Sequence, residues 1–183
     1  MIVEWGPLRA VLAGPAEVAP YVDALSAAYN DPANAPLLGN TEIIAPDDVL
    51  ALYAESAAQR SFLFFDGDAL AGDGDLRGIR GQTAEFAFLI ASPAAQGKGF
   101  GTRFATMVHA AAFGAFGLAH VYASVVPANT ASLRVFEKLG YARDDSPTAR
   151  AYADEPGDLV LGIARDAFLG RHAAALAEIR VIP

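Results

Sequence analysis

The chain has 183 residues and a formal net charge of -8, from 13 basic and 21 acidic side chains. Hydrophobic residues make up 54% of the sequence, which is enough for one sizeable core, and cysteine is absent. The lack of cysteine excludes disulfide frameworks, thiolate metal sites and a cysteine nucleophile. The negative charge argues against nucleic acid and anionic membranes as partners, and no export or transit signal is visible, so a cytoplasmic protein is expected.

The first half of the sequence predicts a strand, two helices and then three strands separated by turns. Gly-Pro at 14–15 and Pro-Asp-Asp at 46–48 are typical of helix starts, whereas the intervening segment 30–44, rich in Asn and Pro, predicts a loop. Asp-Gly-Asp at 66–68 is a hairpin signal. The strands are expected over 8–13, 61–65, 69–79 and 83–91.

The second half predicts helices and strands in alternation. Gly117 and Gly140 are expected to end two helices, and Pro127 ends the strand between them. The uncharged segment 104–133 is interrupted by glycines and this proline, so no membrane-spanning helix is expected. The helices are expected over 102–116, 129–139 and about 166–178, and the strands over 120–126, 141–143 and 159–163. The whole chain, 1–183, therefore predicts a single mixed α/β domain.

The segment 96–102, Gln-Gly-Lys-Gly-Phe-Gly-Thr, lies between a predicted strand and a predicted helix. Its three alternate glycines have no Cβ atoms, so successive backbone N–H groups can turn toward one point. The following helix adds its unpaired N–H groups and the positive end of its dipole. This arrangement predicts a phosphate site, although a flexible connection between strand and helix would have a similar composition.

The spacing fits neither a dinucleotide loop, G-x-G-x-x-G, nor a Walker loop, which needs Gly-Lys followed by Ser or Thr. It fits Q-x-x-G-x-G, with Gln96, Gly99 and Gly101 in place, and 129–141 fits N-x-x-S-x-x-x-F-E-K-L-G-Y. Both motifs resemble the GCN5-related N-acetyltransferase (GNAT) superfamily. The serine of the second motif is most similar to the branch that acetylates the N-termini of ribosomal proteins. The resemblance is specific over about 83–143.

The resemblance implies a fold and a co-substrate. The fold is a mixed, mostly antiparallel sheet with flanking helices, in which the fourth and fifth predicted strands, 83–91 and 120–126, splay apart. Acetyl-CoA is the implied co-substrate, with its diphosphate at the glycine loop and its pantetheine arm paired like an added strand. Asn129 is expected to cap its helix and to bind this arm. The residues that the resemblance assigns to acetyl-CoA are Leu89, Ile90, Ala91, Gln96, Gly97, Lys98, Gly99, Phe100, Gly101, Thr102, Asn129, Ser132 and Phe136.

The resemblance also implies that two side chains, Glu85 and Ser132, assist the transfer of the acetyl group. Glu85 is the implied base, since it is the single charged residue of 83–91 and the superfamily often places its base there; the alternative is a side chain facing water. Phe136 stands where many relatives have a tyrosine acid and cannot donate a proton. Ser132 is therefore the implied hydrogen-bond donor to the leaving sulfur, and the alternative is a hydroxyl bonded to the carbonyl one helical turn earlier.

The predicted activity is transfer of an acetyl group from acetyl-CoA to a primary amine, without a metal. His109, His120 and His172 have no metal-ligand spacing. A protein N-terminus is the first choice of acceptor and a small-molecule amine the second, in a pocket expected from 16–53 and 144–158. A CoA-binding sensor or interaction module that has lost catalysis is the alternative function. The resemblance also leaves a homodimer open.

Overall fold

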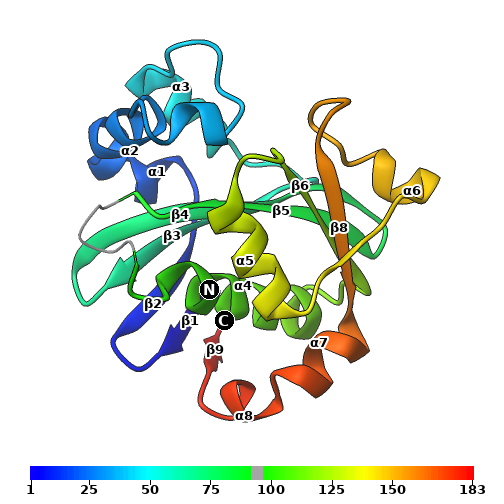
Figure 1. Ribbon diagram of the computed structural model, residues 1–183. Helices are drawn as coiled ribbons and strands as arrows, with labels where there is room; N and C mark the ends of the chain where they lie inside the picture. Colours follow the sequence, from blue (N-terminus) through cyan, green and yellow to red (C-terminus); the bar gives the residue numbers. More distant parts are fainter. Residues whose placement is uncertain (92–96) are drawn as a thin grey trace.

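The computed structural model describes residues 1–91 and 97–183, and its strands form one nine-stranded sheet in the order β7-β8-β6-β5-β4-β3-β2-β1-β9 (Figure 1). Neighbouring strands are antiparallel except β5 and β6, which are parallel. The strands are β1 (Ile2–Trp5), β2 (Leu8–Ala13), β3 (Arg60–Asp66), β4 (Ala69–Arg80), β5 (Thr83–Leu89), β6 (His120–Val125), β7 (Ala142–Arg143), β8 (Leu159–Ala164) and β9 (Arg180–Ile182). This topology confirms the predicted mixed, mostly antiparallel sheet.

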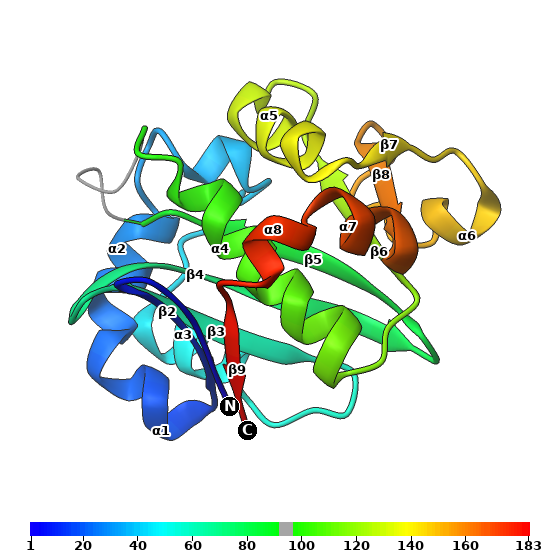
Figure 2. The same ribbon diagram turned by 90° about the horizontal axis from the view of Figure 1, so that it is seen from below.

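Helices cover both faces of the sheet (Figures 1 and 2). Apolar residues of α1, α2 and α3 pack against Leu63 and Phe65 on one face, and α4, α5 and α7 cover the other. The helices are α1 (Pro15–Val18), α2 (Val22–Tyr29), α3 (Pro46–Leu52), α4 (Phe100–Ala110), α5 (Thr130–Leu139), α6 (Pro147–Arg150), α7 (Arg165–Arg171) and α8 (Ala173–Leu176), with 3-10 turns at Ala19–Tyr21 and Ala35–Leu37. Within the described ranges, no helix combines the length and the apolar character needed to cross a membrane.

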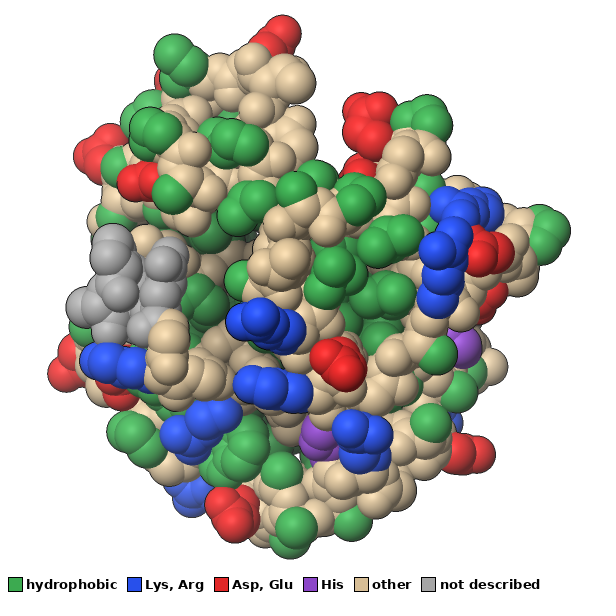
Figure 3. Space-filling model, viewed as in Figure 1, with side chains coloured by type: hydrophobic (Ala, Val, Ile, Leu, Met, Phe, Trp, Pro, Cys, Tyr) green, Lys and Arg blue, Asp and Glu red, His purple; other side chains and the backbone are tan. Residues whose placement is uncertain are grey.

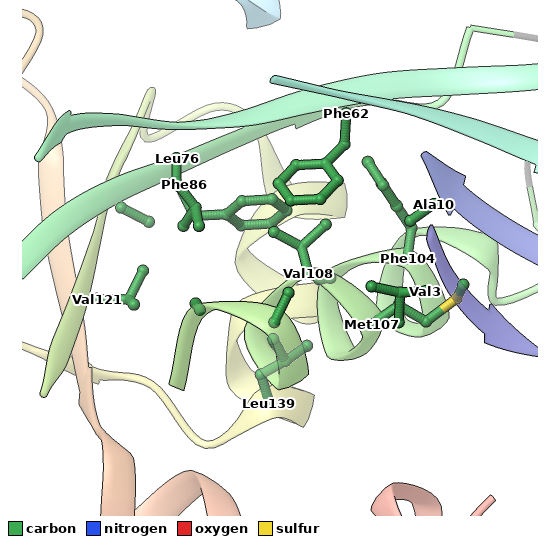
Figure 4. Close-up of a cluster of buried hydrophobic side chains, with 14 of the residues drawn as sticks. Val3, Ala10, Phe62, Leu76, Phe86, Phe104, Met107, Val108, Val121 and Leu139 are labelled. Carbon is green, nitrogen blue, oxygen red and sulfur yellow. The ribbon is translucent and has the colours of Figure 1, made fainter. Parts of the chain in front are cut away.

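The larger core lies between α4 and the sheet (Figure 4). Phe104 of α4 stacks on Phe64 of β3 with ring centroids 4.6 Å apart, and Phe86 of β5 meets Phe104 edge-on at 6.2 Å. All three rings are buried. Since burial of one such ring contributes about 1.5–3 kcal/mol, this cluster fixes α4, and with it the preceding glycine loop, against the sheet.

Several element boundaries differ from the predicted ones. α4 begins at Phe100 rather than at 102, and a π-helical turn at Ala111–Ala115 follows it. The predicted C-terminal helix, 166–178, is divided at His172 into α7 and α8. The segment between the predicted strands 141–143 and 159–163, where no helix is expected, contains the short helix α6.

The predicted elements do not include β1 and β9, which extend the sheet beyond β2. Ile2 of β1 lies opposite Ile182 of β9, so the two chain ends lie side by side (Figure 2). Arg103 of α4 stacks over the Trp5 ring at 4.5 Å and donates to the Trp5 carbonyl at 3.1 Å. β1 therefore contacts the first turn of α4, where Arg103 has a structural role.

The parallel strands β5 and β6 are paired only at their starts. Thr83 lies opposite His120 and Glu85 opposite Tyr122, and no described residue of β5 beyond Glu85 pairs with β6. The strands therefore splay apart from Phe86 onward, as predicted.

Candidate active site

A cavity of about 410 Å³ lies where β5 and β6 part. It is lined from both faces of the sheet, because successive side chains of a strand point to opposite faces. Phe86 and Phe88 lie on the face that carries α5, whereas Ala87 and Leu89 lie on the opposite face. The cavity therefore passes through the sheet. Figure 3 shows a notch between the α1–α3 region and the segment that connects α6 to β8.

The N-terminal half of α5 forms one side of the cavity. Asn129 caps this helix by accepting from the Ser132 N–H at 3.0 Å, and its amide donates to the Leu37 carbonyl at 3.1 Å. The Ser132 hydroxyl donates to no carbonyl among the described residues, so the alternative of a bond to the preceding turn is not observed. Phe136 is buried and packs edge-on against Phe88 at 5.9 Å. The cavity is thus lined by all three residues that the sequence assigns to α5 and its cap, which are Asn129, Ser132 and Phe136.

The glycine loop requires its glycines for two different reasons. Gly97 and Gly99 have φ of 74° and 77°, a conformation that residues with a Cβ rarely adopt. A Cβ at Gly101 would lie 3.2 Å from Phe88 and 3.3 Å from Val135. Gly101 therefore allows close packing of α4 on β5 and α5 beside the cavity.

The start of α4 has the features of an anion site. Among the described residues, no carbonyl accepts from the N–H of Gly101 or Thr102, which lie in the first helical turn. Lys98 is exposed, with Nζ 5.9 Å from the centre of the Phe100 ring, and basic side chains gather on this face of the molecule (Figure 3). Gln96, which the sequence assigns to the same site, lies outside the described residues.

Leu89, Ile90 and Ala91 are the residues predicted to pair with an extended arm. The Ala91 N–H donates to the Ala71 carbonyl at 2.9 Å, so this amide is already used within the sheet. Because the N–H groups of successive strand residues point to opposite sides, the Phe88 N–H points away from β4 and toward β6. Phe88, which is not among the residues predicted from the sequence, therefore lines the opening between β5 and β6.

On the opposite face, two tyrosines hold Asp73. The hydroxyls of Tyr29 and Tyr53 donate to Asp73 Oδ2 at 2.6 Å and 2.8 Å. Asp73 is 2% exposed, and its Oδ1 has no hydrogen-bond partner in the described part of the chain. Burial raises the pKa of Asp73 to about 6, although both tyrosine hydroxyls favour its charged form. Asp73 thus ties α2 and α3 to β4 at the edge of the cavity.

The predicted base, Glu85, is engaged by Arg77. Arg77 donates to both Glu85 oxygens, at 2.9 Å and 3.1 Å, and to Asp154 at 2.6 Å. Glu85 is 5% exposed, so the alternative that it faces water is wrong. Burial raises the pKa of Glu85, and Arg77 opposes this shift. Of this pair it is Arg77 that lines the cavity.

Asp75 lies between these two clusters on the same face of β4, and it lines the cavity. Its carboxylate has no hydrogen bond or ion pair with any described residue. Burial raises the pKa of Asp75 to about 7, with Arg77 opposing the shift and Asp73 adding to it. Asp73, Asp75 and Arg77 are not among the site residues predicted from the sequence. The signal that could have found them is their period of two within the glycine-rich segment 69–79.

The segment before β8 adds further carboxylates to the cavity, from Asp154, Glu155 and Asp158. Asp158 accepts from the Ser124 hydroxyl at 2.9 Å, and the Ser124 oxygen accepts from the Asp154 N–H at 3.0 Å. Acidic side chains are visible on this wall of the notch in Figure 3. The cavity thus includes residues from both segments expected around the acceptor pocket, 16–53 and 144–158.

The buried histidine of α4 has a structural role. His109 Nδ1 lies 2.7 Å from the Ala105 carbonyl, and Nε2 lies 2.5 Å from the Tyr141 hydroxyl. Burial lowers the pKa of His109 to about 4, so the neutral ring donates to Ala105 and accepts from Tyr141. No group of three His, Cys, Asp or Glu side chains suited to a metal ion occurs in residues 1–91 and 97–183.

A family model described as an acetyltransferase (GNAT) domain matches residues 18–142, which is more than half of the chain. The chain belongs to the GNAT acetyltransferase family. This membership confirms the superfamily predicted from the two motifs, and with it an acetyl-CoA-dependent N-acetyltransferase. No curated protein sequence matches the chain.

Solved structures of other GNAT proteins share the fold. The spermidine N-acetyltransferase of Vibrio cholerae, in complex with CoA and spermine, has a TM-score of 0.72 at 20% identity, over 89% of this chain and 98% of that one. RimJ of Mycobacterium smegmatis, in complex with CoA-disulfide, has a TM-score of 0.72 at 16% identity, over 100% and 96%. The ribosomal-protein-S5-alanine acetyltransferase of Vibrio fischeri has a TM-score of 0.72 at 15% identity, over 91% and 97%.

Proposed function

We propose that this GNAT chain transfers an acetyl group from acetyl-CoA to a primary amine by direct attack within the cavity between β5 and β6. The observation that carries the proposal is the passage of this cavity through the sheet. Its α5 side includes apolar and hydroxyl side chains, and its other side includes five carboxylates together with Arg77 and two tyrosines. Donor and acceptor would therefore meet from opposite faces.

The residues on the α5 side fit acetyl-CoA, which supplies a thioester carbonyl as the electrophile. The N–H groups and the helix dipole at loop 97–102 favour a diphosphate. The Phe88 N–H points toward the opening, where it would pair with an extended amide chain and polarise the carbonyl. Ser132 lines the same cavity and would donate a hydrogen bond to the sulfur.

The carboxylate side of the cavity suits a cationic amine. An amine must be neutral to attack, which costs about 4.6 kcal/mol at pH 7 for a lysine-like amine and about 1 kcal/mol for an α-amino group. A protein or peptide N-terminus is our first choice of acceptor, supported by the likeness to RimJ and to the ribosomal-protein acetyltransferase. A small polyamine is the second, supported by the spermidine N-acetyltransferase and by Asp154, Glu155 and Asp158.

A CoA-binding sensor without turnover is the alternative function. Two observations favour it: both oxygens of Glu85 are bound by Arg77, and Phe136 stands where many relatives have a tyrosine. The two functions differ in whether thiol is released.

The deciding experiment measures CoA affinity by calorimetry and thiol release from acetyl-CoA. The acceptors are peptides with a free N-terminus, N-blocked lysine peptides and spermidine, and mass spectrometry identifies the acetylated product. Release with at least one amine is expected. CoA binding without release from any acceptor would establish the sensor, and failure to bind CoA would refute both functions.

We further propose that residues 1–183 form one acetyltransferase domain and that the protein is cytoplasmic. A homodimer is a further possibility raised by the resemblance, and light scattering of the purified protein tests for it.

A further inference from the structure

We propose that Asp75 of β4, rather than Glu85, accepts the proton of the attacking amine. This inference rests on the proposed acetyl transfer, and it adds a residue that lies outside both sequence motifs. It follows from the positions of Asp73, Asp75 and Arg77 on β4 and from the hydrogen bonds that the side chains around Asp75 already make.

The strand register places Asp75 beside the opening of the sheet. Asp75 lies opposite Ala87 of β5 and opposite Ser61 of β3. Ala87 comes two residues after Glu85, the last residue of β5 that pairs with β6. Asp75 therefore flanks the cavity at the level where β5 and β6 begin to part, and both of its cross-strand neighbours have small side chains.

Of the three carboxylates that β4 and β5 place on this face, Asp75 is the one with neither oxygen bound by another described residue. Arg77 binds both oxygens of Glu85 and is held on its other side by Asp154. Asp73 is 2% exposed, with one oxygen bound by two tyrosine hydroxyls. Since a general base must come within hydrogen-bond reach of the proton that it removes, Asp75 is better placed than its neighbours.

The surroundings adjust the proton affinity of Asp75 to this task. The titratable groups around the cavity are Asp73 and Arg77 on β4, Glu85 on β5, Tyr29 on α2, Tyr53 directly after α3, and Asp154, Glu155 and Asp158 before β8. Burial raises the pKa of Asp75 to about 7; Arg77 lowers it, while Asp73, Glu85 and Asp154 raise it. A base is most effective when its pKa lies near the working pH, because it is then largely ionised and still binds a proton well.

The proposed step balances in atoms and charge. The acceptor arrives as an ammonium ion, and the Asp75 carboxylate takes one proton, which leaves an electron pair on the neutral nitrogen. The nitrogen attacks the thioester carbonyl carbon, the C–N bond forms, and the C–S bond breaks with its electron pair on sulfur. A second proton leaves the nitrogen and joins the thiolate. The products are an N-acetyl amide, the CoA thiol and one proton, which Asp75 releases to water.

The test compares Asp75→Asn with Glu85→Gln in steady-state kinetics from pH 6 to pH 9, using one peptide α-amine and one lysine side-chain amine. Asp75→Asn is expected to lower kcat/KM about 100-fold for the lysine amine and less for the α-amine. It should also remove the rise of kcat/KM near pH 7 while CoA affinity stays within about twofold of the wild type, a pattern that a structural defect would not produce. Asp68→Asn, in the exposed turn directly before the same strand, is the matched control and should leave these kinetic parameters unchanged.

Chemical rescue gives an independent measurement. Asp75→Ala should regain part of its lost rate in the presence of formate, which can fill the space of the missing carboxylate. Unchanged kinetics of both Asp75 variants, or loss of the rise near pH 7 in Glu85→Gln alone, would overturn the proposal and leave the acetyl transfer itself intact. A wild-type chain that releases thiol with no amine would instead refute the proposed function.

Discussion

Arg77 and Glu85 face each other across β4 and β5, and the guanidinium donates to both carboxylate oxygens, at 2.9 Å and 3.1 Å. Paired hydrogen bonds between two charged groups are stronger and more directional than single neutral ones. Because Arg77 also binds Asp154, this pair connects two strands of the sheet to the segment before β8. Glu85 therefore holds one wall of the acceptor side in place.

Replacing Glu85 should weaken the fold. Glu85→Gln removes the charge opposite a partly buried guanidinium and is expected to lower the free energy of unfolding by about 1.5–3 kcal/mol, measured by urea denaturation at pH 7. Asp68→Asn breaks the exposed ion pair with Arg9 and should cost less than about 1 kcal/mol. Equal stability of the two variants would contradict the structural role of Glu85.

The stability of the chain should depend on the ionisation of Asp73 and Asp75. Their pKa values, about 6 and about 7, lie above the value near 3.9 expected in the unfolded chain. The folded state then binds more protons, so this contribution to stability is fully present below about pH 4 and is lost progressively as the pH rises from there to about 7. Asp75→Asn should therefore raise the thermal midpoint at pH 8, by about 2–4 °C for each kcal/mol, and raise it less at pH 5.

The difference between variant and wild type is the quantity to measure, because His109 contributes an opposite trend. Its pKa of about 4 lies below that of an unfolded histidine, so its contribution is lost as the pH falls. His109 is present in both proteins and cancels in the difference. An equal gain for Asp75→Asn at pH 5 and pH 8 would show that the Asp75 carboxylate is not destabilised in the folded chain.

Gly101 in α4 and Gly114 in the π-helical turn that follows it provide a matched pair for the packing of this helical segment. A Cβ at Gly101 would lie 3.2 Å from Phe88 and 3.3 Å from Val135, whereas nothing lies within 4 Å of a Cβ at Gly114. Gly114→Ala should stabilise the chain by up to about 1 kcal/mol, the usual gain for alanine over glycine in a helix. Gly101→Ala should lack that gain and weaken CoA binding severalfold in calorimetry. Similar effects of the two variants would argue against a tight contact at Gly101.

Ser132 should act on turnover rather than on binding. Loss of one hydrogen bond to the departing sulfur, at about 1–1.5 kcal/mol, predicts an about 5- to 13-fold lower kcat for Ser132→Ala with unchanged CoA affinity. Thr130→Ala, an exposed hydroxyl at the start of the same helix, is the control and should keep the full kcat. A Ser132 variant with normal kcat would remove this hydroxyl from the mechanism.

The side of the site assigned to the donor could be predicted from the sequence because its features are local. Gly97 and Gly99 need only their own backbone angles, and Asn129 caps a helix by bonding to Ser132, three residues away. Such short-range requirements produce a motif with fixed spacing, which can be recognised in the sequence.

The acceptor side could not be predicted, because its features depend on strand register and distant partners. Asp73 is held by Tyr29 and Tyr53, which lie 44 and 20 residues earlier in the chain. Glu85 is buried by Arg77 only because the β4–β5 register places the two opposite each other. β1 and β9 were missed for the same reason, since each is short and pairs with the far end of the chain.

The passage of the cavity through the sheet has a kinetic consequence. Because the two reactants are proposed to approach from opposite faces of the sheet, neither must depart before the other arrives, and both are expected to reside on the protein together as a ternary complex. Initial-velocity plots should then show intersecting rather than parallel lines. A single compound that joins the CoA sulfur to an amine through a short acyl bridge would occupy both sides of the cavity at once, and it should bind more tightly than either half alone.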